Sequence, residues 1–194
     1  MDIAIVCFDG FTDIDTFLPW DLLNRVRLRE DGWSVKLLGD KPEHISIAGL
    51  KTPMHGTLDD AKDADAVLFT SGAKGIRTLL EDGAWLDQFR LDPARQMIGS
   101  MCTGSVLLAK LELLEGLTAT TYPTSVALLE SLGIRVVEEP IVIHGNIATA
   151  AGCLAAERLS RWVIEGLTGK GDSGRRVGVG PAGWGRMPGP VNGA

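Results

Sequence analysis

The stretch Gln96-Met-Ile-Gly-Ser-Met-Cys102-Thr-Gly-Ser-Val-Leu-Leu-Ala-Lys110 decides the fold of this 194-residue chain. Residues 96–101 have the apolar character of a short buried strand, and residues 103–114 have the spacing of a helix with one apolar face. Cys102 therefore stands where a strand turns into a helix. Such a turn places one side chain at the carboxyl end of a sheet and directs free backbone N–H groups toward it.

This position favours Cys102 as a nucleophile. A thiol at a helix N-terminus is expected to lose its proton more easily, and the thiolate is the reactive form. The arrangement corresponds to the nucleophile elbow of serine hydrolases, with sulfur in place of oxygen and with Gly104 allowing a tight turn. The alternative is that Cys102 is a small buried hydrophobic side chain. For Cys7, in an apolar strand, and Cys153, at the start of the last helix, we expect core packing.

The composition indicates one globular domain. A chain of this length can bury one core, and 45% hydrophobic residues is ordinary for such a protein. The net charge of −6 and the pI of about 5.1 speak against nucleic acid or an acidic membrane surface as partner. The sequence has no run that could span a bilayer, no signal-peptide pattern and no disulfide framework. We therefore expect a cytoplasmic protein that acts on a small molecule.

Strand-like and helix-like segments alternate along the chain. Nearly continuous apolar strands separated by helices predict a mostly parallel sheet covered on both faces, which is a three-layer α/β sandwich. Residues 44–54 are expected to form a small hairpin or an extended excursion. Strands are expected at residues 3–8, 33–38, 66–70, 96–101, 117–121, 134–138 and 141–150, and helices at 16–29, 76–91, 103–114 and 153–167.

The predicted domain spans residues 1–168. From residue 169 to 194 the chain is rich in Gly, Pro and Arg and has no hydrophobic periodicity. Such a segment cannot bury enough apolar surface to offset the entropy lost on ordering. We predict a flexible or loosely docked tail, in which Trp184 could pack against the domain.

Sites in parallel sheets lie at the carboxyl ends of the strands. Three loops are expected to meet there: one after residue 8, one after residue 70, and the one at Cys102. Asp15, between the first strand and the first helix, is the expected acid, because a carboxyl group near a thiol can exchange a proton with it. Asp15 could instead only cap the helix, and Asp13 is a rival that would face a different way.

Six further residues are candidates for binding substrate or a developing anion. A glycine after a buried strand can present its N–H group to an oxyanion, and a threonine beside the thiol can add a hydroxyl. The residues after the double threonine are expected to form the far wall of the pocket, although each candidate could also have an ordinary turn or packing role. The candidates are Gly72, Ala73, Thr103, Gly104, Thr121 and Tyr122.

We expect no metal and no cofactor. His44, His55 and His144 lie far apart and show no ligand spacing. The segment at 71–75 lacks the length and the terminal residues of a phosphate-binding loop. No histidine follows Cys102 locally, which gives little support to a protease that uses a Cys–His pair.

Two stretches resemble the ThiJ/PfpI superfamily. Residues 9–19, Asp-Gly-Phe-Thr-Asp-Ile-Asp-Thr-Phe-Leu-Pro, are similar to its first loop and helix, and residues 100–121, which begin Ser-Met-Cys-Thr-Gly, are similar to its isonitrile hydratase branch. The resemblance covers about residues 1–167. It implies the flavodoxin-like sandwich in its class I glutamine amidotransferase-like form, and it implies a homodimer. It also implies that Cys102 is the nucleophile and that Asp15 is the acid that contacts it.

Some positions depart from the pattern of that branch. Tyr122 and Pro123 stand where the branch has His and then Trp, and Ser71 stands where it has a first glycine. Cys153 lies in a late glycine-rich stretch that is more crowded than usual. Because these positions are expected to line the pocket, the identity of the substrate does not follow from the resemblance.

The resemblance implies three kinds of function. The first is a cysteine-dependent hydratase or hydrolase like isonitrile hydratase, in which the Cys102 thiolate attacks the substrate while Asp15 exchanges a proton and positions water. The second is a glyoxalase or deglycase type of activity on 2-oxoaldehydes. The third is a non-enzymatic protein that senses oxidants or binds a ligand. A DNA-binding regulator is disfavoured, because the 169–194 segment is too short for a helix-turn-helix domain.

Overall fold

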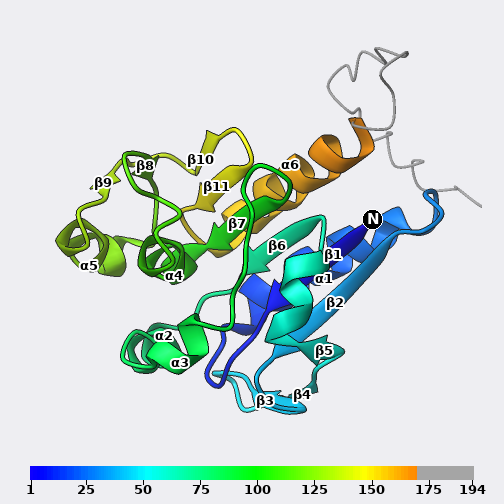
Figure 1. Cartoon of the computed structure of the whole chain (residues 1–194), viewed down its shortest axis with the longest axis horizontal. Coiled ribbons are helices and arrows are strands. Elements are labelled where there is room, and N and C mark those ends of the chain that lie inside the picture. Colours follow the sequence, from blue (N-terminus) through cyan, green and yellow to red (C-terminus); the bar gives the residue numbers. More distant parts are fainter. Residues whose placement is uncertain (170–194) are drawn as a thin grey trace, which may run out of the picture.

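The computed structural model describes residues 1–169, so the predicted tail, apart from Gly169, lies outside the described residues, as does Trp184. Seven strands form the main sheet in the order β10-β11-β7-β6-β1-β2-β5 (Figure 1). Neighbouring strands are parallel except for β10 and β11. The strands are β1 (Asp2–Val6), β2 (Ser34–Gly39), β5 (Gly56–Thr57), β6 (Ala66–Phe69), β7 (Met97–Met101), β10 (Ile141–His144) and β11 (Ile147–Ala150).

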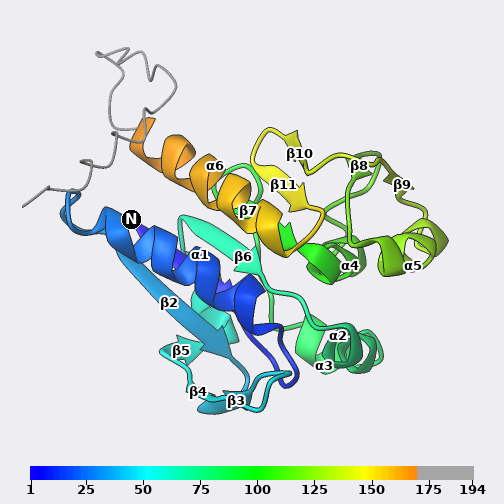
Figure 2. The same ribbon diagram turned by 180° about the vertical axis from the view of Figure 1, so that it is seen from behind.

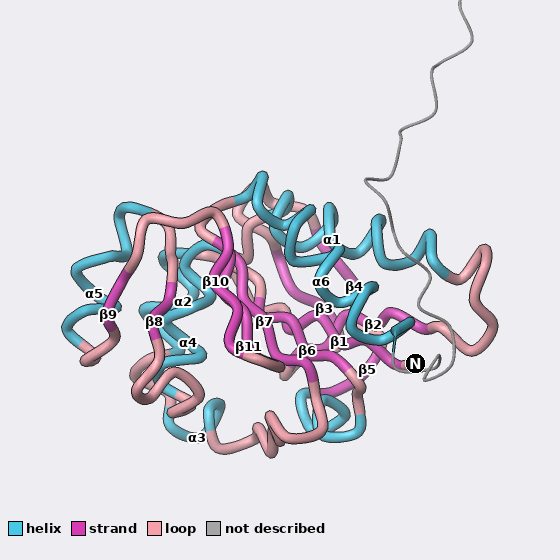
Figure 3. Tube along the Cα trace, turned by 90° about the horizontal axis from the view of Figure 1, so that it is seen from above, coloured by secondary structure: helices cyan, strands magenta, loops and turns pink. Residues whose placement is uncertain are grey.

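The middle of the sheet is buried on both faces. Every residue of β6 and β7 is buried, as are residues 3–6 of β1, which is the pattern expected of central parallel strands. Helices α1 (Asp13–Val26) and α6 (Ala156–Gly169) pack together on one face (Figure 2). Helix α4 (Ser105–Lys110) packs on β6 and β7, and the 3-10 helix η1 (Leu58–Asp63) packs on β1 and β2. The predicted three-layer α/β sandwich is therefore confirmed, and Figure 3 shows the layers from above.

The smaller elements differ from the predicted ones mainly in length. The excursion is a hairpin of β3 (Glu43–Ile45) and β4 (Lys51–Pro53). The strands expected at 117–121 and 134–138 shrink to β8 (Thr118–Ala119) and β9 (Arg135–Val136), which pair with each other outside the main sheet. The segment at 76–91 holds the short helices α2 (Ala73–Leu79) and α3 (Gly83–Leu86), and α5 (Val126–Ser131) follows β8. Among the described residues, no helix has the length and apolar character needed to cross a membrane.

The turn from β7 into α4 packs closely on the end of β6. A Cβ atom added at Gly104 would lie 2.7 Å from the carbonyl oxygens of both Phe69 and Thr70. These are backbone atoms of a central strand and its loop, so they cannot move aside like the end of a flexible side chain. The glycine therefore allows the turn to approach β6, and this approach places Cys102 beside the loop that follows β6.

We expect Gly104→Ala to destabilise the protein, because the added methyl group must displace backbone at the centre of the fold. Overpacking of this kind costs about 1–3 kcal/mol, which should lower the melting temperature by several degrees. Gly83→Ala is the matched control, since nothing lies within 4 Å of its added Cβ. Thermal unfolding followed by circular dichroism checks this, and equal melting temperatures for the two variants would contradict it.

Candidate active site

Cys102 lies directly after β7, in the 3-10 turn Cys102–Gly104 that leads into α4. Its φ of 53° falls in the left-handed region, which few residues other than glycine adopt and which is common at functional turns. Its carbonyl oxygen accepts hydrogen bonds from the hydroxyl groups of Thr121, at 3.0 Å, and Ser105, at 3.2 Å. The side chain is only 7% exposed. The turn is therefore held in one conformation and presents the thiol to a nearly closed site.

Asp15 lies in the first turn of α1 and is completely buried. One carboxylate oxygen accepts a hydrogen bond from the Ser71 hydroxyl, whereas the other, Oδ1, has no hydrogen-bond partner. Asp13 faces elsewhere, because its carboxylate accepts the backbone N–H of Ala48 at 3.2 Å. Of the two acids considered from the sequence, Asp15 is the one that the structure brings to the site.

The electrostatics at Cys102 differ from what the sequence led us to expect. Burial raises the pKa of its thiol to about 12, and the nearby negative charge of Asp15 contributes to the rise. The Thr103 backbone N–H and the Ser71 hydroxyl lower the pKa, but they do not offset these effects. The prediction of an easily ionised thiol is therefore wrong, because the turn buries Cys102 against a carboxylate rather than a cation. Attack by this sulfur requires a base to take its proton.

Cys153 lies near Asp15, which the sequence analysis did not predict. It opens the 3-10 turn Cys153–Ala155 before α6, and it is half-buried rather than packed in the core. Its thiol pKa is raised to about 11 by burial and by interaction with Asp15. A signal was present in the sequence, because Cys153 follows the last strand of a parallel sheet whose carboxyl edge carries the site.

The predicted binding residues surround Cys102 in different ways. The Gly72 N–H group donates to the Thr103 hydroxyl at 3.1 Å, so it reaches an oxyanion only when that bond is released. Ala73 and Thr103 line a small cavity of about 40 Å³. The Thr121 hydroxyl donates a hydrogen bond to the Cys102 carbonyl. The Tyr122 side chain is 43% exposed, and its ring lies 3.6 Å from the position that a Cβ on Gly152 would take. Their roles in binding substrate stay predictions.

The histidines have structural partners. His55 accepts the Leu37 N–H, His44 contacts Asp9, and His144 contacts Thr118. Within residues 1–169 there is no group of three side chains placed to hold a metal ion. The reactive groups that the structure brings together near Cys102 are its thiol and the buried Asp15 carboxylate.

The chain belongs to the DJ-1/PfpI family. The family's sequence profile matches residues 1–166, which confirms the resemblance seen in the sequence. Isonitrile hydratase from Pseudomonas putida is 33% identical over 170 residues, which make up 87% of this chain and 73% of that enzyme.

Solved structures of the family share the fold. Schizosaccharomyces pombe DJ-1 has a TM-score of 0.72 at 17% identity, over 86% of this chain and 92% of that one. A ThiJ/PfpI family protein from Pseudomonas syringae has a TM-score of 0.76 at 21% identity, over 92% of this chain and 78% of that one. At these identities the similarity shows the fold alone.

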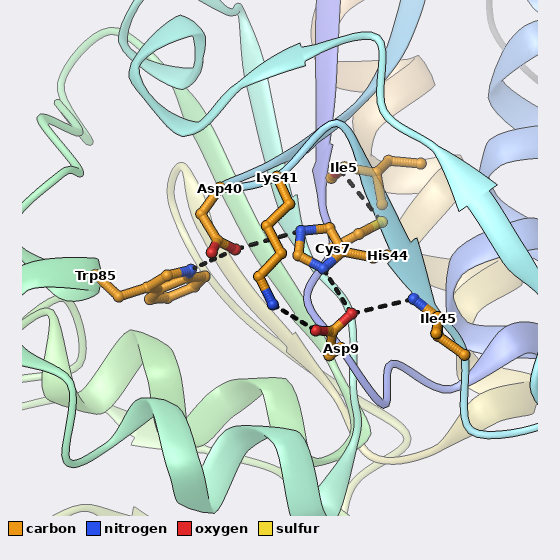
Figure 4. A network of polar contacts seen from close by, with 8 residues as sticks. All are labelled: Ile5, Cys7, Asp9, Asp40, Lys41, His44, Ile45 and Trp85. Carbon is orange, nitrogen blue, oxygen red and sulfur yellow. Dashed lines mark hydrogen bonds and ion pairs between the residues drawn. The ribbon is translucent and has the colours of Figure 1, made fainter.

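In this DJ-1/PfpI protein, the loop that leads to Asp15 is clamped by a polar network around Asp9 (Figure 4). The Asp9 carboxylate contacts the Lys41 ammonium at 2.6 Å, His44 Nδ1 at 3.0 Å and the Ile45 N–H at 3.1 Å. Chiefly because of Lys41, the pKa of Asp9 is lowered to about 2. A cavity of about 500 Å³ lies over this network and not over Cys102. These contacts of Asp9 with Lys41, His44 and Ile45 form a clamp that was not predicted from the sequence.

The clamp connects the hairpin of β3 and β4 to the site. Gly10 N–H donates to the Ile45 carbonyl at 2.7 Å, and Thr12 N–H donates to the Ser71 carbonyl at 2.8 Å. Ser71 in turn donates its hydroxyl to Asp15. The segment between β1 and α1 is therefore held from both sides, which fixes where α1 begins and thus the position of Asp15 in its first turn.

The pKa of the Cys102 thiol can be tested through Asp15→Asn. Removing the negative charge should lower the thiol pKa, so that iodoacetamide modifies Cys102 several-fold faster at pH 8 than in the native protein. Asp13→Asn is the control, since Asp13 contacts Ala48 instead. Peptide mapping after timed labelling gives the rate for each cysteine. An unchanged rate at Cys102 in Asp15→Asn would show that the carboxylate does not act on this thiol.

Two variants that break the Asp9–Lys41 ion pair should differ in how much they lower the free energy of unfolding. Lys41→Ala removes a half-exposed surface partner and should change the free energy of unfolding by about 1 kcal/mol or less. Asp9→Ala also leaves the Ile45 N–H and His44, which is 1% exposed, without their acceptor, and it should cost about 1–3 kcal/mol. Urea unfolding measures both. Equal losses would mean that only the surface ion pair matters.

Proposed function

We propose that this protein is a cysteine-dependent hydratase that acts on a small organic molecule, with isonitriles as the substrate class. The observation that carries the proposal is the buried Asp15 carboxylate beside the Cys102 thiol, with one oxygen free of any hydrogen bond. The similarity to isonitrile hydratase, at 33% identity over most of both chains, supports the choice of substrate class.

The raised thiol pKa determines how the first step proceeds. Cys102 is protonated near neutral pH, so Asp15 accepts the thiol proton as the sulfur attacks the terminal carbon of the isonitrile. The same carboxyl group then returns that proton to the carbon, which gives a thioimidate bound to Cys102. The proton leaves sulfur and arrives on carbon, and Asp15 is again a carboxylate.

The second step hydrolyses the thioimidate. Asp15 accepts a proton from water as the water oxygen bonds to the thioimidate carbon, and it returns that proton to the nitrogen. The carbon–sulfur bond then breaks as the C=O bond forms, and the remaining hydroxyl proton passes to the departing sulfur. The products are an N-substituted formamide and the free thiol, so the net reaction adds one water to one isonitrile. The Ser71 hydroxyl holds one Asp15 oxygen in place and leaves the other for both proton transfers.

We expect the native protein to convert alkyl or aryl isonitriles to formamides, detected by the formyl proton in NMR spectra. Cys102→Ser should abolish turnover, and Asp15→Asn should lower it by about 10²–10⁴-fold. Cys7→Ser is the matched control, because the Cys7 thiol is fully buried and donates to the Ile5 carbonyl, so its loss should leave turnover within about twofold. The Asp15→Asn protein should therefore be alkylated faster at Cys102 yet turn over more slowly, while Cys7 stays protected. General unfolding would instead expose the fully buried Cys7 to alkylation as well.

A parallel assay with methylglyoxal discriminates the second function considered from the sequence. Production of lactate from methylglyoxal, without formamide from any isonitrile, would replace the hydratase proposal by a glyoxalase activity of the same thiol. Isonitrile turnover that persists in Cys102→Ser would show that the reaction does not use this nucleophile.

A further inference from the structure

Cys153 stands close to Cys102 because of the order of the strands. β7 and β11 are adjacent and parallel, with Ala150 opposite Met101. Cys102 directly follows Met101, and Cys153 comes three residues after Ala150, so both cysteines leave the same edge of the sheet from neighbouring strands. Adjacent strands lie about 4.8 Å apart.

Two further contacts bring the segments of these cysteines together. Thr121 binds the Cys102 carbonyl, and the next residue, Tyr122, packs against Gly152, which directly precedes Cys153. On the other side, α1 packs along α6 (Figure 2), and the Cys153 thiol, just before α6, interacts with Asp15 in the first turn of α1. Both thiols consequently lie around the same carboxylate, whose negative charge acts on each of them.

The buried carboxylate itself indicates that the two thiols act together. Asp15 Oδ1 has no hydrogen-bond partner although Asp15 is fully buried, and a buried charge without a partner is costly. Cys102 and Cys153 both carry a proton at neutral pH, and either can be deprotonated by this oxygen. Cys7 has no such neighbour, since burial among apolar strands alone raises its pKa well above the usual range.

We propose that Cys153 is a resolving cysteine, which closes a disulfide with Cys102 after a hydroperoxide has oxidised the nucleophile. In the first step Asp15 accepts the Cys102 proton, the sulfur attacks the distal peroxide oxygen, and the O–O bond breaks. Cys102 becomes a sulfenic acid, and Asp15 passes the thiol proton to the departing oxygen. The peroxide is thereby reduced to an alcohol, or to water when it is hydrogen peroxide.

In the second step the Cys153 sulfur attacks the sulfenic sulfur, its proton joins the departing hydroxide, and water leaves. The two thiols are together oxidised by two electrons and one peroxide is reduced. Cys153 is partly exposed, so this turn lies near the surface rather than in the core.

Hydrogen peroxide in modest excess, followed by intact mass and non-reducing peptide mapping, tests the proposal on the full chain. The native protein should lose about 2 Da and yield a Cys102–Cys153 linked peptide. Dithiothreitol should restore at least nine-tenths of the alkylation of Cys102. The readout is a mass, so it does not depend on whether the protein hydrates isonitriles.

Cys153→Ser keeps the size of the side chain but cannot resolve a sulfenic acid. It should instead gain about 32 Da at Cys102, as sulfinic acid that dithiothreitol does not reverse. Cys7→Ser is the control for removal of a cysteine and should behave like the native protein, and Cys153→Ala supplies a second test if the serine variant fails to fold. A native protein that gains about 32 Da at Cys102 while Cys153 stays alkylatable would overturn the proposal.

Discussion

The site depends on one interaction, the burial of the Asp15 carboxylate against the Cys102 thiol. A buried carboxylate is stable only where hydrogen bonds and protic groups replace water, and here one oxygen is held by Ser71 while two thiols lie nearby. The same charge raises the pKa of both thiols. Cys102 is therefore held as a protonated thiol next to a carboxylate, rather than as a thiolate, and we propose that this carboxylate is its base.

The rest of the fold keeps these groups in place. The close approach of Gly104 to β6 and the left-handed conformation of Cys102 direct the thiol toward the loop after β6. The clamp around Asp9 and the hydrogen bond from Thr12 to Ser71 together hold the segment between β1 and α1 at the point where α1 begins. A parallel sheet makes this possible because loops from β1, β6, β7 and β11 all emerge at one edge.

Much of this could be predicted from the sequence, because it depended on local patterns. The strand before Cys102, the turn with Gly104 and the following helix have periodicities that a single segment reveals. The motif around Asp15 indicated the carboxylate that the structure places near Cys102, and the family membership is confirmed. The homodimer, the small-molecule substrate and the roles of the binding residues stay predictions.

The features that could not be predicted from the sequence depend on groups that lie far apart along the chain. The pKa of Cys102 is set by burial and by a carboxylate from another element, and no local signal contains either. The clamp joins Asp9 to His44 through a hairpin whose position is fixed only by the folded sheet. Core packing was preferred for Cys153 over slight activation at the start of its helix, although its position after a sheet strand indicated the edge of the sheet where the site lies.

The proposed chemistry requires Cys102 to be a protonated thiol paired with a buried base. The most direct measurement is the difference in ultraviolet thiolate absorbance between the native protein and Cys102→Ser, followed against pH. With a pKa of about 12, Cys102 should contribute no thiolate signal at neutral pH and should begin to do so only in strongly alkaline solution. A full thiolate signal from Cys102 at pH 7 would contradict this account, because the sulfur would then need no base.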